Sequence, residues 1–473
     1  MNVPFDFRPP SPFMFAAGKA GLLELRSTRE SVFRMAAVIR QWYDRYSTEP
    51  GQPLQFPAGH PMTPEFIAAC WHAGVPYWIE PAATVPGLTD RASRLLNPLP
   101  YRWRDALHEY LDCKGDDFAA PFFSAESDAV FSYLFTSGSS GAPKLVALRR
   151  SQMLAAFKSM VAGLLPDKLE CWLLCLPLNH IGGAAVVLRS WLNGNSVVDA
   201  RMVSYEDLLA QLSGNESLAL ASLVPSQLDK LLDLGGPSIV HPNFKAVLLG
   251  GGPSPNALIE EARSRAVPVM KSYGMTETCA HVISVPADAL HNAPFGCSGK
   301  PNAGHEIQIR DEFGAMLPAG ETGLLWVRGP QLINGYADAP AGTEAAFDAE
   351  GWFCTGDYAR TDADGWVYIE MRRSDLVVSG GENINPGEVE AILRSEIAGI
   401  TDIVIGGLPD ARWGQKLVAW LVLEGEKPDP VALRRTLKKV MPPYMVPAEF
   451  RFPAQIPRNE MGKIQREALK NLF

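Results

Sequence analysis

Short apolar segments alternate with amphipathic segments through the first two thirds of the chain. The apolar runs, each bounded by Pro, Gly or a polar residue on at least one side, include 171–176, 218–224, 246–249 and 267–270. Between them, apolar residues recur at helical spacing in segments 205–212 and 226–234. Strands that alternate with helices predict an α/β architecture with buried, parallel or mixed sheets.

The pattern changes near residue 370. Segment 365–370 predicts a strand, 371–375 is polar, and 376–378 is apolar again. Asn385, followed by Pro, Gly and Glu388, predicts a helix start, because Asn caps helices and Pro suits the first helical position. The remaining pattern of strand, strand, helix and Pro-rich tail is typical of a small α+β domain. We therefore predict a large N-terminal α/β domain at 1–371, a hinge at 372–375 and a C-terminal domain at 376–473.

Composition limits the class of protein. A chain of 473 residues is too long for one core, so at least two domains are expected. Apolar residues make up 47% and charged residues 20%, which argues against disorder. The net charge of −9 disfavours a general nucleic-acid-binding protein, and we expect no nucleic-acid partner.

Cysteine usage and the N-terminus indicate a cytoplasmic protein. Seven dispersed cysteines with no Cys-x-x-Cys pair fit a reducing compartment better than a zinc site. The N-terminus carries Asp6 and Arg8 without a long apolar core, so no signal peptide is predicted. No apolar run approaches the ~20 residues that span a membrane, so we expect no membrane partner.

The loop that follows Tyr133 is the strongest candidate for chemistry. It contains two glycines and four hydroxyl side chains, and it ends on Pro143 and Lys144. Glycines let backbone N–H groups approach a phosphate, and a Lys adds a point charge. The common nucleotide P-loop is excluded, because Gly138 and Gly141 are separated by two residues instead of four. A phosphate cup and a flexible surface loop both stay open at this point.

Four further segments follow in order: 249–253, 271–278, 352–357 and 457–463. Together with the loop, they resemble the adenylate-forming superfamily, which includes acyl- and aryl-CoA ligases, nonribosomal adenylation domains and luciferases. The resemblance runs from about Leu134 to Arg466. The portion before the loop is short for the family and carries no recognisable motif.

The resemblance implies a two-step reaction with ATP, Mg²⁺ and CoA. A carboxylic acid is first joined to the α-phosphate of ATP, which releases pyrophosphate, and a thiol then displaces AMP. Both reactants of the first step are anions, so the site must offset their repulsion. The residues implied to hold the β- and γ-phosphates are Thr136, Ser137, Gly138, Ser139, Ser140, Gly141 and Lys144.

Other roles follow from the same resemblance. Thr276 is implied to contact the α-phosphate, and Glu277 to ligate Mg²⁺, which prefers hard oxygen ligands. Asp357 is implied to accept hydrogen bonds from the ribose hydroxyls, with help from Arg372. The residues implied to form the adenine slot are Gly250, Gly251, Gly252, Pro253 and Tyr273.

The C-terminal portion is implied to move between the two steps. Lys463 is implied to bridge the acid and the α-phosphate; its alternative is a solvated Lys in the tail. Ser374 is the implied pivot of the hinge. Gly380 and Gly381 are implied to let pantetheine pass, or else form a simple tight turn. His180 is implied to be a catalytic residue, because it stands where acyl- and aryl-CoA ligases carry a gating His or aromatic residue. A lone His after an apolar strand is, however, often a core or turn residue.

The motifs identify the acid substrate and the thiol acceptor less closely than they identify the nucleotide. Segment 179–183 lacks the carboxylate that amino-acid-activating domains use for a substrate ammonium, so α-amino acids are disfavoured and free CoA is favoured over a carrier protein. Among CoA ligases, segments 176–182, 248–253, 272–278 and 372–384 resemble those of the o-succinylbenzoate–CoA ligases of menaquinone biosynthesis. Gly182, Gly183 and Ala184 are expected to leave room for a flat aromatic acid.

Alternatives to a CoA ligase remain. One is a stand-alone adenylation enzyme that loads an acid onto a carrier protein, and another is a non-catalytic relative. A homodimer is also left open. Arg149 and Arg150 stand where the family often has a Thr-His pair; they are either harmless surface variation or ligands for the 3′-phosphate of CoA.

Overall fold

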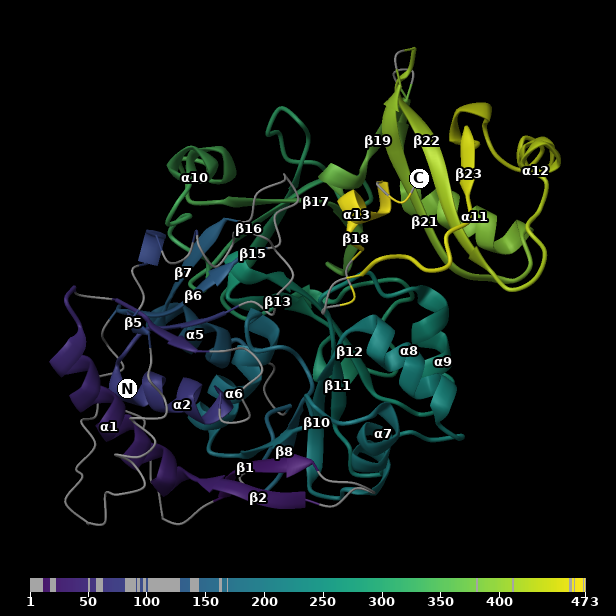
Figure 1. Cartoon of the computed structure of the whole chain (residues 1–473). Coiled ribbons are helices and arrows are strands. Elements are labelled where there is room, and N and C mark those ends of the chain that lie inside the picture. The colour runs from purple at the N-terminus through teal and green to yellow at the C-terminus, as the bar shows by residue number, and fades with distance from the viewer. Residues whose placement is uncertain are drawn as a thin grey trace. The chain divides into compact units, whose positions relative to one another are not determined.

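The computed structural model describes residues 12–17, 23–49, 52–56, 63–80, 91, 94–96, 99–100, 128–136, 144–160, 164–167, 169–379, 382–410, 412–458, 462, 464–470 and 472 (Figure 1). Its contacts divide the chain into two units. The first comprises Met1–Ile307, Val327–Phe353 and Asp364–Val367, and the second Gln308–Trp326, Cys354–Ala363 and Tyr368–Phe473. The hinge at 372–375 and the boundaries derived from it stay predictions.

The first unit is built on a nine-stranded sheet with the order β14-β13-β12-β11-β10-β8-β9-β1-β2. The consecutive strands from β12 to β1 run parallel, whereas β13 and β14 at one end and β2 at the other pair antiparallel. The strand bounds are β1 Pro12–Ala17, β2 Leu23–Thr28, β8 Cys171–Leu174, β9 Ser196–Asp199, β10 Leu218–Leu223, β11 Ala246–Leu249, β12 Val269–Met275, β13 Ala280–Ser284 and β14 Lys300–Pro301.

The predicted alternation of strands and helices is confirmed in this sheet. The strands β8, β10 and β11 are buried along their whole length, as expected of strands covered on both faces. The helices α7 (Tyr205–Gly214), α8 (Pro225–Leu234) and α9 (Asn256–Ser264) bury their apolar faces in the same core as these strands. Because parallel strands end at one edge, the loops after β11 and β12 meet there.

A second sheet in the first unit has the order β5-β3-β4-β6-β7. Its strands are β3 (Leu54–Phe56), β4 (Tyr77–Ile79), β5 (Leu99–Pro100), β6 (Val130–Phe135) and β7 (Leu145–Arg149). The helices of this region are α1 (Arg29–Tyr46), α2 (Thr63–Ala73), α5 (Arg150–Lys158), α6 (Ile181–Asn193) and α10 (Pro340–Ala346). Strands β6 and β7 pair antiparallel, so the loop predicted to bind phosphate connects two neighbouring strands.

Most residues of two further sheets belong to the second unit. One has the order β15-β16-β17-β18, with bounds Glu306–Arg310, Gly323–Arg328, Phe353–Thr361 and Val367–Arg372. The other has the order β20-β19-β22-β21, with β23 beside β22; the bounds are β19 Val377–Ser379, β20 Glu382–Ile384, β21 Ile400–Asp410, β22 Gly414–Leu423 and β23 Glu449–Arg451. Its helices are α11 (Pro386–Glu396), α12 (Pro430–Leu437) and α13 (Arg466–Lys470). Asn385 caps α11 by accepting a hydrogen bond of 2.9 Å from the Gly387 amide, so the predicted helix start is confirmed.

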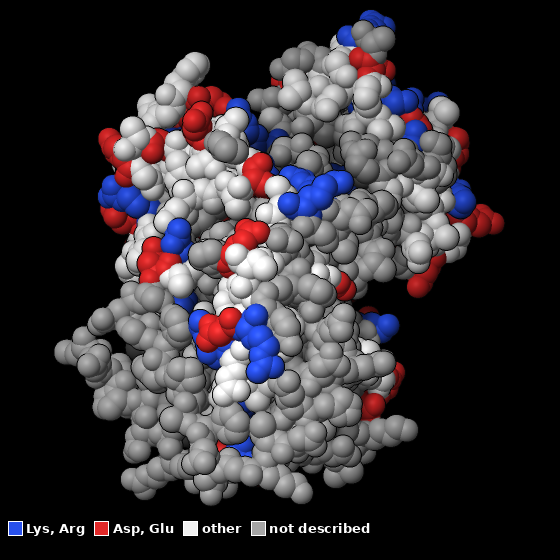
Figure 2. Space-filling model, turned by 60° about the vertical axis from the view of Figure 1, so that its left-hand side comes forward, with Lys and Arg blue, Asp and Glu red and all other residues white. Residues whose placement is uncertain are grey.

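No helix in the described ranges is both long enough and apolar enough to cross a membrane. On the face seen in Figure 2, the described Lys and Arg side chains lie among Asp and Glu side chains.

Arg29 ties the N-terminal portion, which carried no recognisable motif, to the rest of the first unit. Its guanidinium is buried and donates to the backbone oxygens of Trp191, Ser190 and Asn195 at 3.1, 3.1 and 2.9 Å. It also lies over the rings of Phe13 and Trp191, at 5.2 and 4.8 Å from their centroids. Burial lowers the pKa of Arg29 to about 10. One cation therefore satisfies the carbonyl groups where α6 ends.

We expect Arg29→Ala to lower the free energy of unfolding by about 3 kcal/mol, because buried carbonyl oxygens lose their donor. The matched control is Arg34→Ala on the same helix, whose side chain is exposed and pairs with Glu30 at 2.7 Å. Removing that surface pair should change stability by about 0.5 kcal/mol or less. Urea denaturation followed by circular dichroism measures both. Equal effects of the two variants would contradict the role assigned to Arg29.

Candidate active site

The ends of the predicted phosphate loop are joined by two hydrogen bonds. The Thr136 amide donates to the Lys144 carbonyl at 2.9 Å, and the Lys144 amide donates to the Thr136 hydroxyl at 3.3 Å. Thr136 is buried and Lys144 is partly exposed. The remaining predicted residues of this loop, which lie outside the described residues, are Ser137, Gly138, Ser139, Ser140 and Gly141.

A short segment from much later in the chain runs beside the end of this loop. Tyr336 forms an antiparallel bridge with Val146, and the Ala337 amide donates to the Leu145 carbonyl at 2.8 Å. The carboxylate of Asp338 accepts a hydrogen bond of 2.7 Å from the Leu145 amide. Segment 336–338 therefore holds β7 where it leaves the phosphate loop.

Tyr336 connects two residues that the sequence predicted to be functional. The ammonium of Lys144 lies over its ring, 4.3 Å from the centroid. Its hydroxyl donates to Oε1 of Glu277 at 2.9 Å. The structure thus brings the predicted phosphate cation and the predicted magnesium ligand into contact with one side chain.

The sequence analysis missed Tyr336. A weak signal was available in Gly335, which directly precedes it and has a φ of +136°. A Cβ at this glycine would lie 2.6 Å from Cγ2 of Thr343. The glycine is required by this close approach, and the Thr343 hydroxyl accepts a hydrogen bond of 2.8 Å from the Tyr336 amide.

Thr276 and Glu277 lie in a tight turn between β12 and β13. The Glu277 carbonyl accepts a hydrogen bond of 2.9 Å from the Ile333 amide, which fixes the turn from outside. Directly after it, Cys279 and Ala280 have φ values of 46° and 92°. Such values are unusual for residues other than glycine and cluster at functional sites.

Gln331 holds this strained turn. Its side chain is fully buried, and its amide donates to the backbone oxygens of Thr278 and His281 at 2.7 and 3.0 Å. Its side-chain oxygen accepts a hydrogen bond of 3.0 Å from the Ser159 hydroxyl. Because Gln331 is separated from Thr278 by 53 residues, no local motif identified it.

The residues predicted to form the adenine slot share one sheet edge. Parallel pairing of Leu249 with Lys271 places the glycine run after β11 beside the end of β12, where Tyr273 lies. A Cβ at Gly250 would lie 2.8 Å from the Ser272 hydroxyl oxygen and 3.3 Å from the Ser272 carbonyl oxygen, so the glycine run approaches β12 closely here. The other predicted members, which are exposed, are Gly251, Gly252 and Pro253. Their contact with adenine stays a prediction.

His180 occupies the N-cap position of α6 and is partly buried. Its gating role stays a prediction. A Cβ at Gly183 would lie 2.3 Å from the Pro177 carbonyl oxygen, so this glycine serves the packing of the turn. The expectation that Gly183 leaves room for an acid therefore has a competing physical explanation, whereas a Cβ at Gly182 would meet only a Leu176 methyl at 3.2 Å.

Two predicted residues of the second unit are paired. Nε of Arg372 donates to Oδ1 of Asp357 at 3.1 Å. Asp357 is buried, and its amide donates to the Thr355 hydroxyl at 3.2 Å. That hydroxyl donates in turn to the Leu325 carbonyl at 2.9 Å, which anchors the turn. Arg372 therefore lies beside Asp357, and the predicted roles of both residues towards a ribose stay predictions.

Lys463 lies outside the described residues, but the chain on both sides of it is described. Arg458 and Ile464 form an antiparallel bridge that closes the loop. The Arg458 guanidinium donates to both oxygens of Asp402 at 2.9 and 3.0 Å and to the Gly462 carbonyl at 3.0 Å. The loop therefore has a fixed base.

The predicted hinge residue Ser374 lies in the 3₁₀ turn Arg373–Asp375. Gly380 and Gly381 lie outside the described residues. Nothing in these segments tests the predicted rotation or the pantetheine path.

The two consecutive arginines differ in environment. Arg150 is 4% exposed, donates to the Trp71 carbonyl and lies over the Trp71 ring, 4.3 Å from its centroid. Burial lowers its pKa to about 10. Arg150 is therefore a core residue, and it is neither a surface variation nor a ligand for a CoA phosphate. Arg149 pairs with Asp128 at 3.1 Å on the surface, and its proposed contact with CoA stays a prediction.

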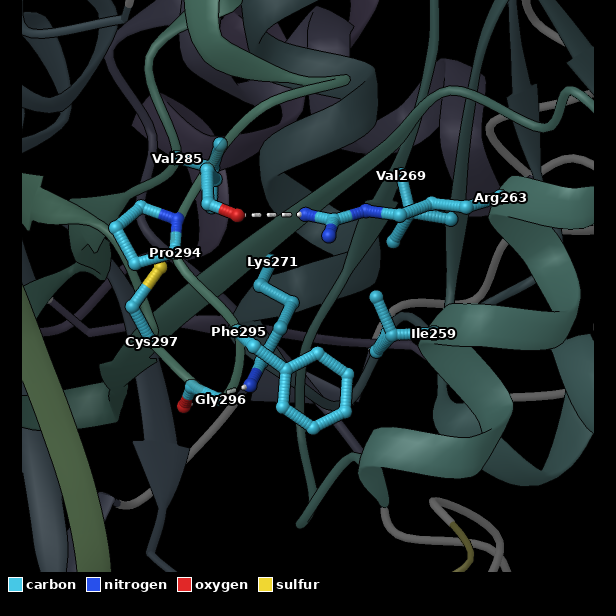
Figure 3. Close-up of a pocket in the computed structure, with 10 residues that line it drawn as sticks. Ile259, Arg263, Val269, Lys271, Val285, Pro294, Phe295, Gly296 and Cys297 are labelled. Atoms are coloured by element: carbon cyan, nitrogen blue, oxygen red, sulfur yellow. Dashed lines mark hydrogen bonds between the residues drawn. The ribbon is translucent and has the colours of Figure 1, made fainter.

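A small pocket beside the first half of β12 does not hold the predicted chemistry. Lys271 and Arg263 line it, and their charged groups donate to the backbone oxygens of Gly296 and Ala293 at 3.4 and 3.2 Å (Figure 3). Burial lowers the pKa of Lys271. Both cations are used to close the turn at 293–297, so we assign them a structural role.

The described residues fit a magnesium ion that arrives with a nucleotide. No group of three or more His, Cys, Asp or Glu side chains among them could hold a metal. Mg²⁺ bound with ATP uses only one or two carboxylates, because phosphate and water oxygens complete its shell. Glu277 fits this requirement. Its Oε1 accepts a hydrogen bond from the Tyr336 hydroxyl, and no described group forms a hydrogen bond with Oε2.

Comparison with known proteins identifies the family of the chain. The family model described as AMP-binding enzyme matches residues 89–337, and the model of its C-terminal domain matches residues 388–463. A 2-succinylbenzoate–CoA ligase of Listeria monocytogenes is 35% identical over 341 residues, which cover 72% of this chain and 69% of that protein. The enzyme of the same name from Bacillus subtilis is 34% identical over 347 residues, covering 73% and 70%.

Solved structures of related proteins have the same fold. The o-succinylbenzoate CoA synthetase of Bacillus subtilis, in complex with its acyl-adenylate intermediate, is similar with a TM-score of 0.82 and 26% identity, covering 98% of this chain and 96% of that one. An ATP-bound structure from Rhodopseudomonas palustris has a TM-score of 0.85 at 21% identity over 98% and 96%, which supports the fold alone. The predicted fold class and resemblance are confirmed: the chain belongs to the AMP-binding enzyme family.

Proposed function

We propose that this protein is an AMP-forming acid–CoA ligase whose acid is 2-succinylbenzoate. The observation that carries the proposal is the similarity to 2-succinylbenzoate–CoA ligases at 35% identity over 72% of the chain. A related structure, 26% identical, contains the adenylate of this acid. ATP, Mg²⁺ and CoA are the corresponding co-substrates and cofactor, and another related structure is a complex with ATP and magnesium.

In the first step, a carboxylate oxygen of the acid attacks the α-phosphorus of ATP, and the bond to the bridging oxygen of pyrophosphate breaks. We assign Lys144 the role of stabilising the negative charge of the departing pyrophosphate. The hydroxyls and amides of the loop 136–144 are further hydrogen-bond donors. Thr276 is assigned to the α-phosphate. Glu277 would hold Mg²⁺, which supplies positive charge to the phosphate oxygens when it is bound.

In the second step, the thiol of CoA attacks the acyl carbon, and the acyl–oxygen bond to AMP breaks. Lys463 is assigned to the first step only, because it would bridge the acid and the α-phosphate. We assign the change between the two steps to rotation about Ser374, which would bring the loop containing Gly380 and Gly381 to the pantetheine. His180 would border the thioester path.

The described cysteines support a reducing compartment, since six of them are free thiols in this fold. We therefore place the reaction in the cytoplasm. Free CoA rather than a carrier protein is the proposed acceptor, because the relatives act as CoA ligases.

An acid panel tests this function directly. ATP–pyrophosphate exchange should be strongest with 2-succinylbenzoate and weaker with benzoate, malonate and fatty acids, and addition of CoA should yield the thioester. Exchange without thioester formation would favour loading of a carrier protein. Absence of exchange with every acid would overturn the proposal.

Lys463→Ala should separate the two half-reactions. We expect ATP–pyrophosphate exchange to fall by about 100-fold or more, since one preorganised contact to the developing charge is lost. Conversion of supplied acyl-adenylate to the CoA ester should persist. Lys439→Ala, an exposed lysine of the same unit, is the control and should affect neither step. Equal damage to both steps in Lys463→Ala would contradict the assignment.

A further inference from the structure

We infer that Tyr336 is a positioning residue that keeps Lys144 and Glu277 oriented but unpaired, so that both charges stay available to the nucleotide and its metal. The inference rests on the proposed function, which assigns Lys144 to phosphate and Glu277 to Mg²⁺. It is carried by two contacts of one side chain: the ammonium of Lys144 lies 4.3 Å from the ring centroid, and the hydroxyl lies 2.9 Å from Oε1 of Glu277.

The hydroxyl orients the carboxylate of Glu277. It donates to Oε1, and the Glu277 backbone is held separately by the Ile333 amide at 2.9 Å. With one oxygen occupied by a neutral donor, the other can face a cation without a further change of rotamer. Hydrogen bonds of this kind commonly orient metal-binding carboxylates, and their loss weakens metal binding.

The ring orients Lys144 without neutralising it. No described carboxylate forms an ion pair with this ammonium. The positive charge over the ring face is attracted by the quadrupole of the aromatic system, which carries no net charge. On another side the ammonium is close to Gly342, where an added Cβ would lie 3.3 Å from Nζ. The lysine is thus directed while its charge remains free to meet a phosphate.

A neutral side chain at this position has a specific consequence. A lysine and a glutamate in direct contact would pair, and each would then lose part of its attraction for an incoming ion. Tyr336 contacts both groups with neutral atoms, the ammonium through its ring and the carboxylate through its hydroxyl. It therefore maintains two opposite charges close together in the absence of ligand.

Tyr336 is held independently of any nucleotide. Its amide donates to the Thr343 hydroxyl at 2.8 Å, and its backbone bridges Val146. The next residues extend this attachment, because the Ala337 amide donates to the Leu145 carbonyl at 2.8 Å. A residue fixed in this way can position others at little entropic cost during binding.

Two substitutions separate its two contacts. Tyr336→Phe removes the hydroxyl and keeps the ring, whereas Tyr336→Leu removes both. Tyr336→Phe should raise the Mg²⁺ concentration for half-maximal ATP–pyrophosphate exchange by about tenfold, because Glu277 loses its orienting donor. Tyr336→Leu should also weaken binding of ATP in EDTA by about threefold, because Lys144 loses the ring.

A binding measurement makes the test independent of catalysis. Titration calorimetry with ATP in EDTA should give wild-type affinity for Tyr336→Phe and lower affinity for Tyr336→Leu. With saturating MgCl₂, Tyr336→Phe should regain less affinity than the wild type. The matched control is Tyr368→Phe, which removes another phenol that donates to a carboxylate, that of Asp362 at 3.0 Å, and should leave every value unchanged. Thermal melting verifies that all variants are folded.

The inference and the proposed function fail in different ways. If wild-type protein binds MgATP but forms no adenylate with any acid, the proposed function fails while the binding test of Tyr336 still applies. If wild-type protein is active and Tyr336→Phe keeps the wild-type Mg²⁺ dependence in both assays, the positioning role of the hydroxyl is refuted. Unchanged ATP affinity of Tyr336→Leu in EDTA would refute the role of the ring.

Discussion

The site depends on keeping a cation and an anion close together without letting them pair. A ligase that joins a carboxylate to ATP must attract several negative groups, so its positive charges must not be consumed by its own carboxylates. Yet it also needs Glu277 near the same phosphates for a metal. The neutral side chain of Tyr336 satisfies both needs, with Lys144 over its ring at 4.3 Å and Glu277 at its hydroxyl at 2.9 Å.

The fold makes this contact possible by joining three distant segments. The loop that ends at Lys144 connects two strands of one sheet, and the turn with Glu277 follows a strand of the other. Segment 331–338 links the loop and the turn. The side-chain amide of Gln331 donates a hydrogen bond to the Thr278 carbonyl in the turn, and the carboxylate of Asp338 accepts one from the Leu145 amide, which follows Lys144. The placement of both charges therefore follows from one continuous stretch of backbone.

Residues in contiguous motifs could be predicted from the sequence, and residues defined by distant contacts could not. The alternation of strands and helices and the helix cap at Asn385 follow from local rules of periodicity and capping. Tyr336 lies 59 residues from Glu277, and no spacing rule connects them. Arg150 shows the opposite error, because two adjacent arginines suggested a surface charge, whereas the fold buries one of them against Trp71. Arg29 could not be identified from the sequence either, because the backbone oxygens that accept its hydrogen bonds lie more than 160 residues away.

The strained turn beside Glu277 fits this account. Two consecutive non-glycine residues with positive φ, Cys279 and Ala280, cost on the order of 1–3 kcal/mol each, and such strain persists only where surrounding contacts determine it. The contacts are present, because Gln331 donates to the backbone oxygens on both sides of the pair and is itself fully buried. A relaxed turn would leave the direction of Glu277 to its own rotamers. The strain is thus offset by a buried amide, and the carboxylate gains a fixed direction towards the hydroxyl of Tyr336.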